Sequence, residues 1–291
     1  MNSNLNFKKT RDFGEVLSDT FKFIRENFKH FFTTILKIVS PFLIALILTN
    51  AYYTFTSVSF ATSGANALEI ISSSGESFTA LSLNVLTVVV YIIAIWVVVF
   101  QYIQSYIKNN GVVNTEEVSA GLKRNLGKGI ALQILVGITC FVAIFFMIIP
   151  AFYLGVVLTL ALPILVFENK GISESFTDAF SLIKNNWWFT FGLLFVFGLI
   201  VSFATAIFQM PLIIYTAIKT IVGADSDPST IVNMAQQKDY VLIILSILSS
   251  IIQYIFYAFT PVLVAVIYFS LNEEKNATGT FENIENLGKD N

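Results

Sequence analysis

Five long stretches without a charged residue constrain this chain more than any other feature of its sequence. No Asp, Glu, Lys or Arg occurs in residues 38–68, 77–107, 129–167, 185–218 and 240–272. A helix of about 20 apolar residues crosses the hydrocarbon of a bilayer, and each stretch is long enough to do so. Charged residues make up 12% of the chain, about half of their share in soluble domains. We therefore expect lipid to be the solvent.

The stretch 129–167 is too long for one crossing and contains Pro150 near its middle. We expect two spans that turn at residues 149–151, near the interface, because lipid offers the turn no hydrogen-bond partner. The sequence thus predicts an all-α polytopic membrane protein with one integral domain (1–272) and a polar, disordered tail (273–291). The six spans are expected near 37–58, 83–106, 130–149, 152–168, 188–215 and 240–270.

Lysine and arginine gather in alternate connections between these spans. The first 30 residues and the connection over 107–129 are basic, whereas the opposite side receives only Lys219 and Lys238. Because cytoplasmic loops carry the excess of basic residues, both termini are expected in the cytoplasm. We also expect the protein to lie in the plasma membrane. The charged N-terminus has no apolar signal-peptide core, so the first span is expected to act as its own insertion signal.

An internal repeat precedes two of the spans. Residues 18–28 align without a gap on residues 177–187. In both copies apolar residues recur at steps of three and four, which places them on one helical face. We expect amphipathic interfacial helices over 12–30 and 172–187, the first capped by Asp12 and Glu15. A weaker third copy over 114–129, capped by Asn114 and Glu117, is opposed by Gly121 and Gly127, since glycine disfavours helix.

The repeat places polar residues at equivalent positions on the expected cytoplasmic side. One hypothesis is a rim that binds anionic lipid headgroups or a partner membrane protein. The alternative is that acidic residues begin each helix and basic residues follow, which suits the helix dipole and anionic lipid, with Glu168 as a boundary residue. The rim candidates are Asp19, Arg25, Asn27, Glu168, Asp178, Lys184 and Asn186.

The spans contain amides but no ionisable side chain of the kind that ion-coupled carriers use. Gln101 and Gln104 share a helix face and are the candidates for a polar path. The alternative is that such amides form hydrogen bonds between helices. The chain has a single histidine, His30, and a single cysteine, Cys140, and no nucleotide-binding or hydrolase motif. We expect no enzyme, no cofactor, no metal site and, at a net charge of −2, no nucleic-acid partner.

The segment from Leu162-Pro163 through Glu168 to residues 179–187 resembles the membrane domain found with bacterial glycerophosphodiester phosphodiesterases and related multi-pass proteins. Residues 13–28 are similar to the same family. The resemblance implies a membrane module only, because the hydrolase reaction belongs to a separate barrel rich in histidines and acidic metal ligands. The leading hypothesis is a non-enzymatic protein of lipid or envelope homeostasis. The alternatives are a facilitator or transporter of a neutral or amphiphilic small molecule, and a lipid enzyme that uses Glu168.

Overall fold

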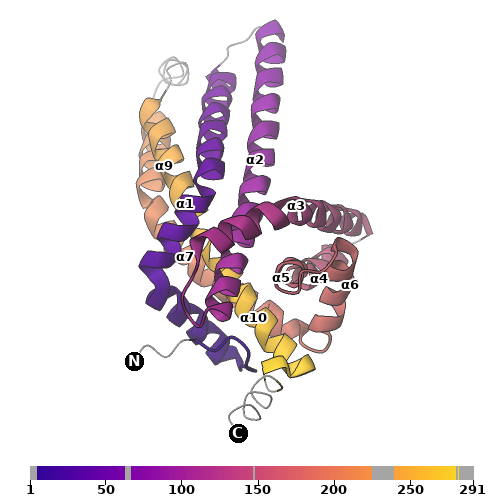
Figure 1. The fold of residues 1–291 in the computed structure, drawn as a ribbon. Helices are drawn as coiled ribbons and strands as arrows, with labels where there is room; N and C mark the ends of the chain where they lie inside the picture. The colour runs from indigo at the N-terminus through magenta and orange to yellow at the C-terminus, as the bar shows by residue number, and fades with distance from the viewer. Residues whose placement is uncertain (1–4, 63–66, 147, 225–238, 280, 282–291) are drawn as a thin grey trace. The chain divides into compact units, whose positions relative to one another are not determined.

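The computed structural model describes residues 5–62, 67–146, 148–224, 239–279 and 281, and every element in them is helical. Six of the helices are long and apolar enough to cross a membrane, so the predicted all-α polytopic fold is confirmed (Figure 1). In chain order the helices are α1 (Phe13–Thr62), α2 (Ala67–Lys108), α3 (Thr115–Phe146), α4 (Ile148–Leu158), α5 (Ala161–Phe167), α6 (Ile172–Ile183), α7 (Trp187–Ala224), α9 (Tyr240–Phe256) and α10 (Phe259–Asn276).

The helices form two compact units. Unit 1 consists of residues 1–39, 93–200 and 258–291, and unit 2 consists of residues 40–92 and 201–257. Each unit therefore combines segments that are far apart in the sequence. Unit 2 consists of the end of α1, the start of α2, the end of α7 and all of α9. Helices α1, α2 and α7 therefore each contribute to both units.

The two repeat copies differ in how their helices continue. The helix expected over 12–30 is not separate, because α1 runs unbroken from Phe13 to Thr62 with Pro41 inside it. In the second copy α6 ends at Ile183 and α7 starts at Trp187, so a boundary does exist there. Asn185 lies between them with a φ of 72°, a left-handed conformation that asparagine tolerates better than most residues. Its counterpart in α1 is Glu26, which stays helical.

Three prolines mark where helices begin. Pro150, Pro163 and Pro261 are each the third residue of their helix, in α4, α5 and α10. A missing N–H costs nothing in the first turn, where the backbone has no intrahelical acceptor. The turn expected at residues 149–151 is therefore shifted, because α3 ends at Phe146 and α4 already starts at Ile148. Residue 147 lies outside the described residues.

The core of unit 1 contains a cluster of aromatic rings and, on α10, a run of aliphatic side chains. Phe7, Phe23, Phe31 and Tyr102 are buried and meet edge to face, with ring centroids 5.1–6.2 Å apart. On α10, residues 262–267 have no exposed surface. Since lipid tails are as apolar as these side chains, such close packing rather than a hydrophobic force holds the helices together.

The tail expected to be disordered from residue 273 is in part ordered. Helix α10 continues to Asn276, and the buried Glu273 carboxylate accepts hydrogen bonds from Gly279 N at 2.6 Å and Thr278 Oγ1 at 3.1 Å. The chain turns at Ala277, whose φ is 48°. The carboxylate therefore fixes the residues that follow α10, and the later part of the predicted tail lies outside the described residues.

Candidate functional site

The repeat extends further than the sequence alignment indicates, through a pair of equivalent ion pairs in unit 1. Arg11 Nε donates to Asp19 Oδ2 at 2.8 Å, and Lys170 Nζ donates to Asp178 Oδ2 at 2.7 Å. In both pairs the basic residue precedes the aspartate by eight positions. Sequence reasoning missed Arg11 and Lys170, although the constant spacing between the copies could have identified them.

The helix starts of the two copies are also equivalent. The Glu15 carboxylate accepts from Asp12 N at 3.3 Å, while Asp12 Oδ1 accepts from Glu15 N at 2.7 Å, so the predicted capping pair is confirmed. In the second copy the Glu174 carboxylate accepts from Gly171 N at 3.2 Å. In each copy, therefore, an ion pair joins a residue before the helix start to an aspartate in the helix. Both Asp19 and Asp178 are paired with a residue near their own helix start.

Arg11 is more buried than Lys170. Its side chain has no exposed surface, and its guanidinium also donates to the backbone carbonyls of Phe7 (2.8 Å), Lys9 (3.0 Å) and Asn6. It therefore fixes the segment that precedes α1. Lys9 lies 3.4 Å from Asp19 as a second cation. Asp19, one of the predicted rim residues, is accordingly occupied by partners within its own copy.

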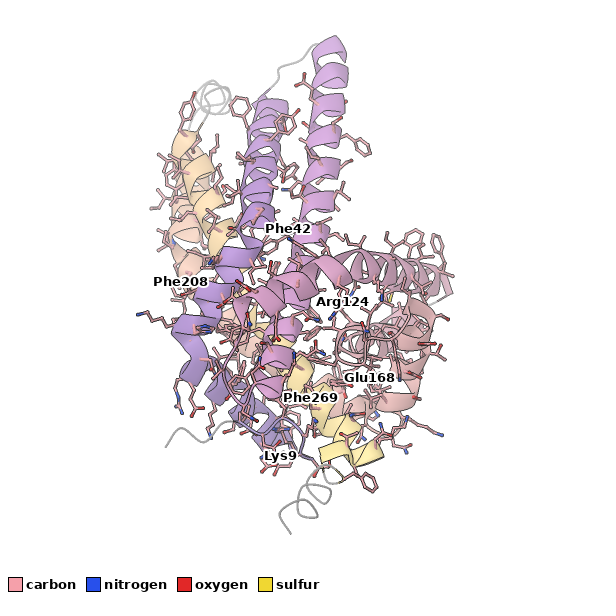
Figure 2. The ribbon with its side chains drawn as sticks, viewed as in Figure 1. Lys9, Phe42, Arg124, Glu168, Phe208 and Phe269 are labelled. Carbon is pink, nitrogen blue, oxygen red and sulfur yellow. The ribbon has the colours of Figure 1, made fainter. Side chains whose placement is uncertain are left out.

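Two other predicted rim residues, Glu168 and Asp178, are brought together by Lys170. Lys170 Nζ lies 2.5 Å from Glu168 Oε2 and 2.7 Å from Asp178 Oδ2. Hydrogen bonds to Asp178 and Glu168 raise the pKa of Lys170 above its ordinary value, so the amine keeps its charge at physiological pH. The Tyr268 hydroxyl donates to Glu168 Oε1 at 2.8 Å. A small cavity of about 180 Å³ adjoins this cluster, and Glu168 is labelled in Figure 2.

The remaining rim candidates do not join either cluster. Arg25 and Lys184 are exposed. The Asn27 amide donates to the carbonyl of Phe23 in its own helix at 3.0 Å, and the Asn186 amide donates to Glu274 Oε2 at 3.1 Å. The residues proposed as one rim thus lie in separate contact networks of unit 1, of which the Glu168–Lys170–Asp178 cluster contains two.

Gln101 and Gln104, the candidates for a polar path, both line a cavity of about 900 Å³ within unit 1. This unit 1 cavity lies between the end of α2, the start of α3, the end of α5 and α10. Gln104 Nε2 donates to the carbonyl of Phe167 at 3.4 Å. Further lining residues include Ser105, Arg124, Phe167, Tyr268, Phe269 and Asn272; Arg124 and Phe269 are labelled in Figure 2.

Gly121 allows α3 to approach α2 beside this cavity. A Cβ atom at Gly121 would lie 2.0 Å from Gln101 Oε1, which is far inside van der Waals contact. Gly121, which was expected to disfavour a helix here, therefore allows helix α3 to pack closely. Helix α3 does start where the third copy was expected, since Asn114 Oδ1 accepts from Glu116 N at 2.9 Å. It then continues as a span without a separate interfacial segment.

Half of the expected cap forms: Glu117 N donates to Asn114 Oδ1 at 3.4 Å, but Asn114 N donates to Ser105 Oγ rather than to the Glu117 carboxylate. The Glu117 carboxylate instead accepts from Lys108 Nζ at 2.8 Å, and from Asn109 Nδ2 and Ser105 Oγ at 3.1 Å each. Glu117 thereby ties the start of α3 to the end of α2 and compensates the charge of Lys108. Arg124, which is exposed at the cavity, forms no ion pair with another described residue. It therefore leaves positive charge available at the unit 1 cavity.

Two buried amides of unit 1 have unused hydrogen-bonding groups, and one of them, Gln101, lines the cavity. Gln101 is 5% exposed and Asn125 is 0% exposed. Gln101 Nε2 and both amide atoms of Asn125 lack a hydrogen-bond partner among the described residues. Buried polar groups are nearly always paired with protein or with ordered water. Sequence reasoning missed Asn125. It lies four residues from both Gly121 and Gly129, and this spacing places all three on one helical face.

The chemistry available at these sites is hydrogen bonding and charge. Among the described residues, no group of three His, Cys, Asp or Glu side chains is placed to hold a metal ion. The unit 1 cavity offers amide groups, a guanidinium and aromatic rings. Arginine forms a planar fork that suits phosphate and carboxylate oxygens. The arrangement can therefore bind a polar or anionic group.

Comparison with known proteins gives one family match. A family profile described as the membrane domain of glycerophosphoryl diester phosphodiesterase matches residues 132–287. The match covers the Glu168–Lys170–Asp178 cluster and α10, whereas Gln101, Gln104 and Arg124 precede it. No curated protein and no solved structure matches the chain.

Proposed function

Because the chain belongs to the family of the membrane domain of glycerophosphoryl diester phosphodiesterase, we propose that it is a non-enzymatic protein of lipid or envelope homeostasis. In this proposal it lies in the plasma membrane with both termini in the cytoplasm. The family and the six apolar helices support a multi-pass membrane protein. The distribution of lysine and arginine supports the orientation.

The observation that carries the proposal is the unit 1 cavity. Its volume of about 900 Å³ lies in the range of small-molecule sites. It is lined where α2 and α5 end and α3 begins, which the proposed topology places at the cytoplasmic headgroup layer. We infer that it holds the polar headgroup of a phospholipid, with Arg124 facing the phosphate and Gln101 and Gln104 offering hydrogen bonds.

Retention of phosphatidylglycerol by the purified full-length protein tests this proposal. Native mass spectrometry from nanodiscs would count the lipid that stays bound to the wild type, Arg124→Gln and Lys123→Gln. Lys123 is the matched control because it is exposed, adjacent and equally charged, and it does not line the cavity. We expect Arg124→Gln to weaken retention about tenfold, as for one charge-assisted hydrogen bond. Equal retention by all three proteins would contradict the proposal.

The non-enzymatic part of the proposal needs its own assay. Incubation of the purified protein with labelled phosphatidylglycerol should release no headgroup above the level seen with empty nanodiscs. Release that is abolished by Glu168→Gln would show a lipid hydrolase instead. Glu168 is the residue to change because its carboxylate accepts a hydrogen bond from Tyr268, which lines the cavity.

A second candidate function is a facilitator of a neutral or amphiphilic small molecule. The observation that favours it is that Gln101 and Gln104 line the same cavity. Flux of labelled glycerol into proteoliposomes is the assay. A rate above that of protein-free liposomes, lost in Gln104→Leu and kept in Arg124→Gln, would favour transport over headgroup binding.

A further inference from the structure

We propose that unit 2 contains a second binding site, between α7 and α9, for the hydroxyl-bearing head of an uncharged amphiphile such as diacylglycerol. A cavity of about 280 Å³ lies there. Its polar lining consists of Ser202, Thr205 and Gln209 on α7, together with Gln253 on α9 and Tyr257 at the C-terminal end of α9. This unit 2 cavity shares no lining residue with the unit 1 cavity, so the inference is independent of the proposed function.

The depth of the polar residues in their spans is the first step of the argument. Gln209 lies 12 residues before Ile221, where its candidate span ends, and Gln253 lies 13 residues after Tyr240, where the last span begins. At the helical rise per residue these separations are about 18 Å and about 20 Å. The hydrocarbon core is about 30 Å thick. Both spans are longer than the hydrocarbon core is thick, so their ends project beyond it. We infer that the two amides, well inside those ends, lie in the hydrocarbon region rather than in the headgroup layer.

Unused hydrogen-bonding capacity is the second step. The side chain of Gln209 forms no hydrogen bond with another described residue. Gln253 Nε2 donates to the Tyr257 hydroxyl at 3.1 Å, which leaves the hydroxyl proton of Tyr257 and Oε1 of Gln253 available. Thr205 Oγ1 uses its proton on the carbonyl of Val201 at 2.7 Å. Amide groups without partners are costly in hydrocarbon, so a group that both donates and accepts would be stabilised here.

The lining also selects the charge of the occupant. All five polar side chains are uncharged at physiological pH, and no Asp, Glu, Lys or Arg lines the cavity. An ionised headgroup would lose its hydration without gaining a counter-charge. Hydroxyl groups, by contrast, donate and accept in the same way as the amides that face them. The chemistry of the site therefore favours an uncharged, hydroxylated head over an anionic one.

The size of the cavity and its surroundings complete the argument. A volume of about 280 Å³ is at the small end of ligand sites, and it is too small for another helix, whose diameter is about 10 Å. It suits a head of the size of glycerol. Phe203 and Ile207, next to the lining residues on α7, are 72% and 67% exposed. They form an apolar surface on which acyl chains can remain in the lipid.

Photolabelling of the full-length protein in nanodiscs tests the site. The probe is a diacylglycerol with a photoactivatable group near its hydroxyl, with phosphatidylglycerol carrying the same group as the charged comparison. We expect diacylglycerol to label peptides of α7 and α9 well above phosphatidylglycerol. Gln209→Met, which keeps the shape of the side chain but removes its hydrogen bonds, should reduce labelling about fivefold, as for one neutral hydrogen bond.

Two further variants keep the result interpretable. Gln133→Met changes the same chemistry within α3, away from the cavity, and should label like the wild type. Ala206→Leu fills the cavity without removing a polar group and should reduce labelling as Gln209→Met does. Equal labelling by both probes, labelling no stronger than from bulk lipid, or equal losses in Gln133→Met would overturn the proposal. So would a change of oligomeric state in Gln209→Met, which would identify the cavity as a contact between copies.

Discussion

Gly121 shows how a single residue decides the packing of two helices. Replacement by alanine should destabilise the protein by about 1–3 kcal/mol, as overpacked sites do, because the new Cβ would lie 2.0 Å from Gln101 Oε1. Thermal unfolding in detergent would measure the loss. Gly127→Ala is the matched control: a Cβ there meets nothing within 4 Å, so the variant should gain about 0.5–1 kcal/mol from the helix preference of alanine.

The double variant Gly121→Ala with Gln101→Ala separates the clash from the substitution itself. If the contact causes the loss, the second change should restore most of the stability that the first removes. Equal losses in Gly121→Ala with and without Gln101 would contradict this account of the glycine. Sequence reasoning counted Gly121 against a helix because glycine lowers helix propensity, and only the facing side chain reveals its purpose.

The two equivalent ion pairs should differ in their contribution to stability. Arg11→Met removes the guanidinium from three backbone carbonyls and leaves Asp19 with Lys9 as its remaining cation. We expect a loss of about 3–5 kcal/mol, because the Arg11 side chain has no exposed surface. Lys170→Met removes a pair whose lysine is 37% exposed, and we expect about 1 kcal/mol or less. Denaturation of both variants in the same detergent is the measurement, and similar losses would refute the distinction.

At the scale of elements, the spans were predictable and their junctions were not. Uncharged stretches located six spans because charge is excluded from hydrocarbon, and Pro150 indicated a hairpin in 129–167. The exact starts of α4, α5 and α10 depend on proline occupying the third helical position, a detail that spans defined by hydropathy do not contain. The break between α6 and α7 depends on non-helical backbone angles at Lys184 (ψ 127°) and Asn185 (φ 72°), which alignment with Arg25 and Glu26 gave no reason to expect.

The left-handed φ of Asn185 makes a testable difference between the two copies. Asn185→Ala should cost about 1–2 kcal/mol, since alanine is strained in the left-handed region, whereas Asn185→Gly should be neutral or stabilising. Thermal midpoints of the two variants would measure this. If alanine and glycine behave alike, the turn at Asn185 is not held in the left-handed conformation.

At the scale of the whole molecule, the sequence predicted the class of fold, and two of its candidate residues, Gln101 and Gln104, are among those that line the larger cavity. It did not predict the rim as it is built. Extending the alignment to Arg11 and Lys170 would have indicated the pairs with Asp19 and Asp178, but it could not show that Lys170 is shared with Glu168. The first copy has Lys9 at the position of Glu168, so the repeat gave no indication of this second carboxylate.

The expected orientation of the whole chain can be tested by cysteine labelling in intact cells. In a Cys140→Ser background, Lys238→Cys should react with a membrane-impermeant maleimide, because it lies on the less basic side of the chain. Lys123→Cys should react only after the cells are permeabilised. Labelling of Lys123→Cys in intact cells would reverse the topology and move the unit 1 cavity to the outer surface.

The prolines also bear on how the molecule can deform. The backbone passes between unit 1 and unit 2 four times, within α1, α2 and α7 and between α9 and α10. Pro41 follows the first passage by two residues, and Pro261 follows the last by four. Pro41 cannot donate to the carbonyl four residues earlier, so one hydrogen bond of α1 is missing across the passage at residues 39–40. Pro261 lies in the first turn of α10, where its N–H would have no intrahelical acceptor, so it removes no such bond. We therefore expect α1 to bend more easily near residues 39–41 than α2 does near 92–93 or α7 near 200–201.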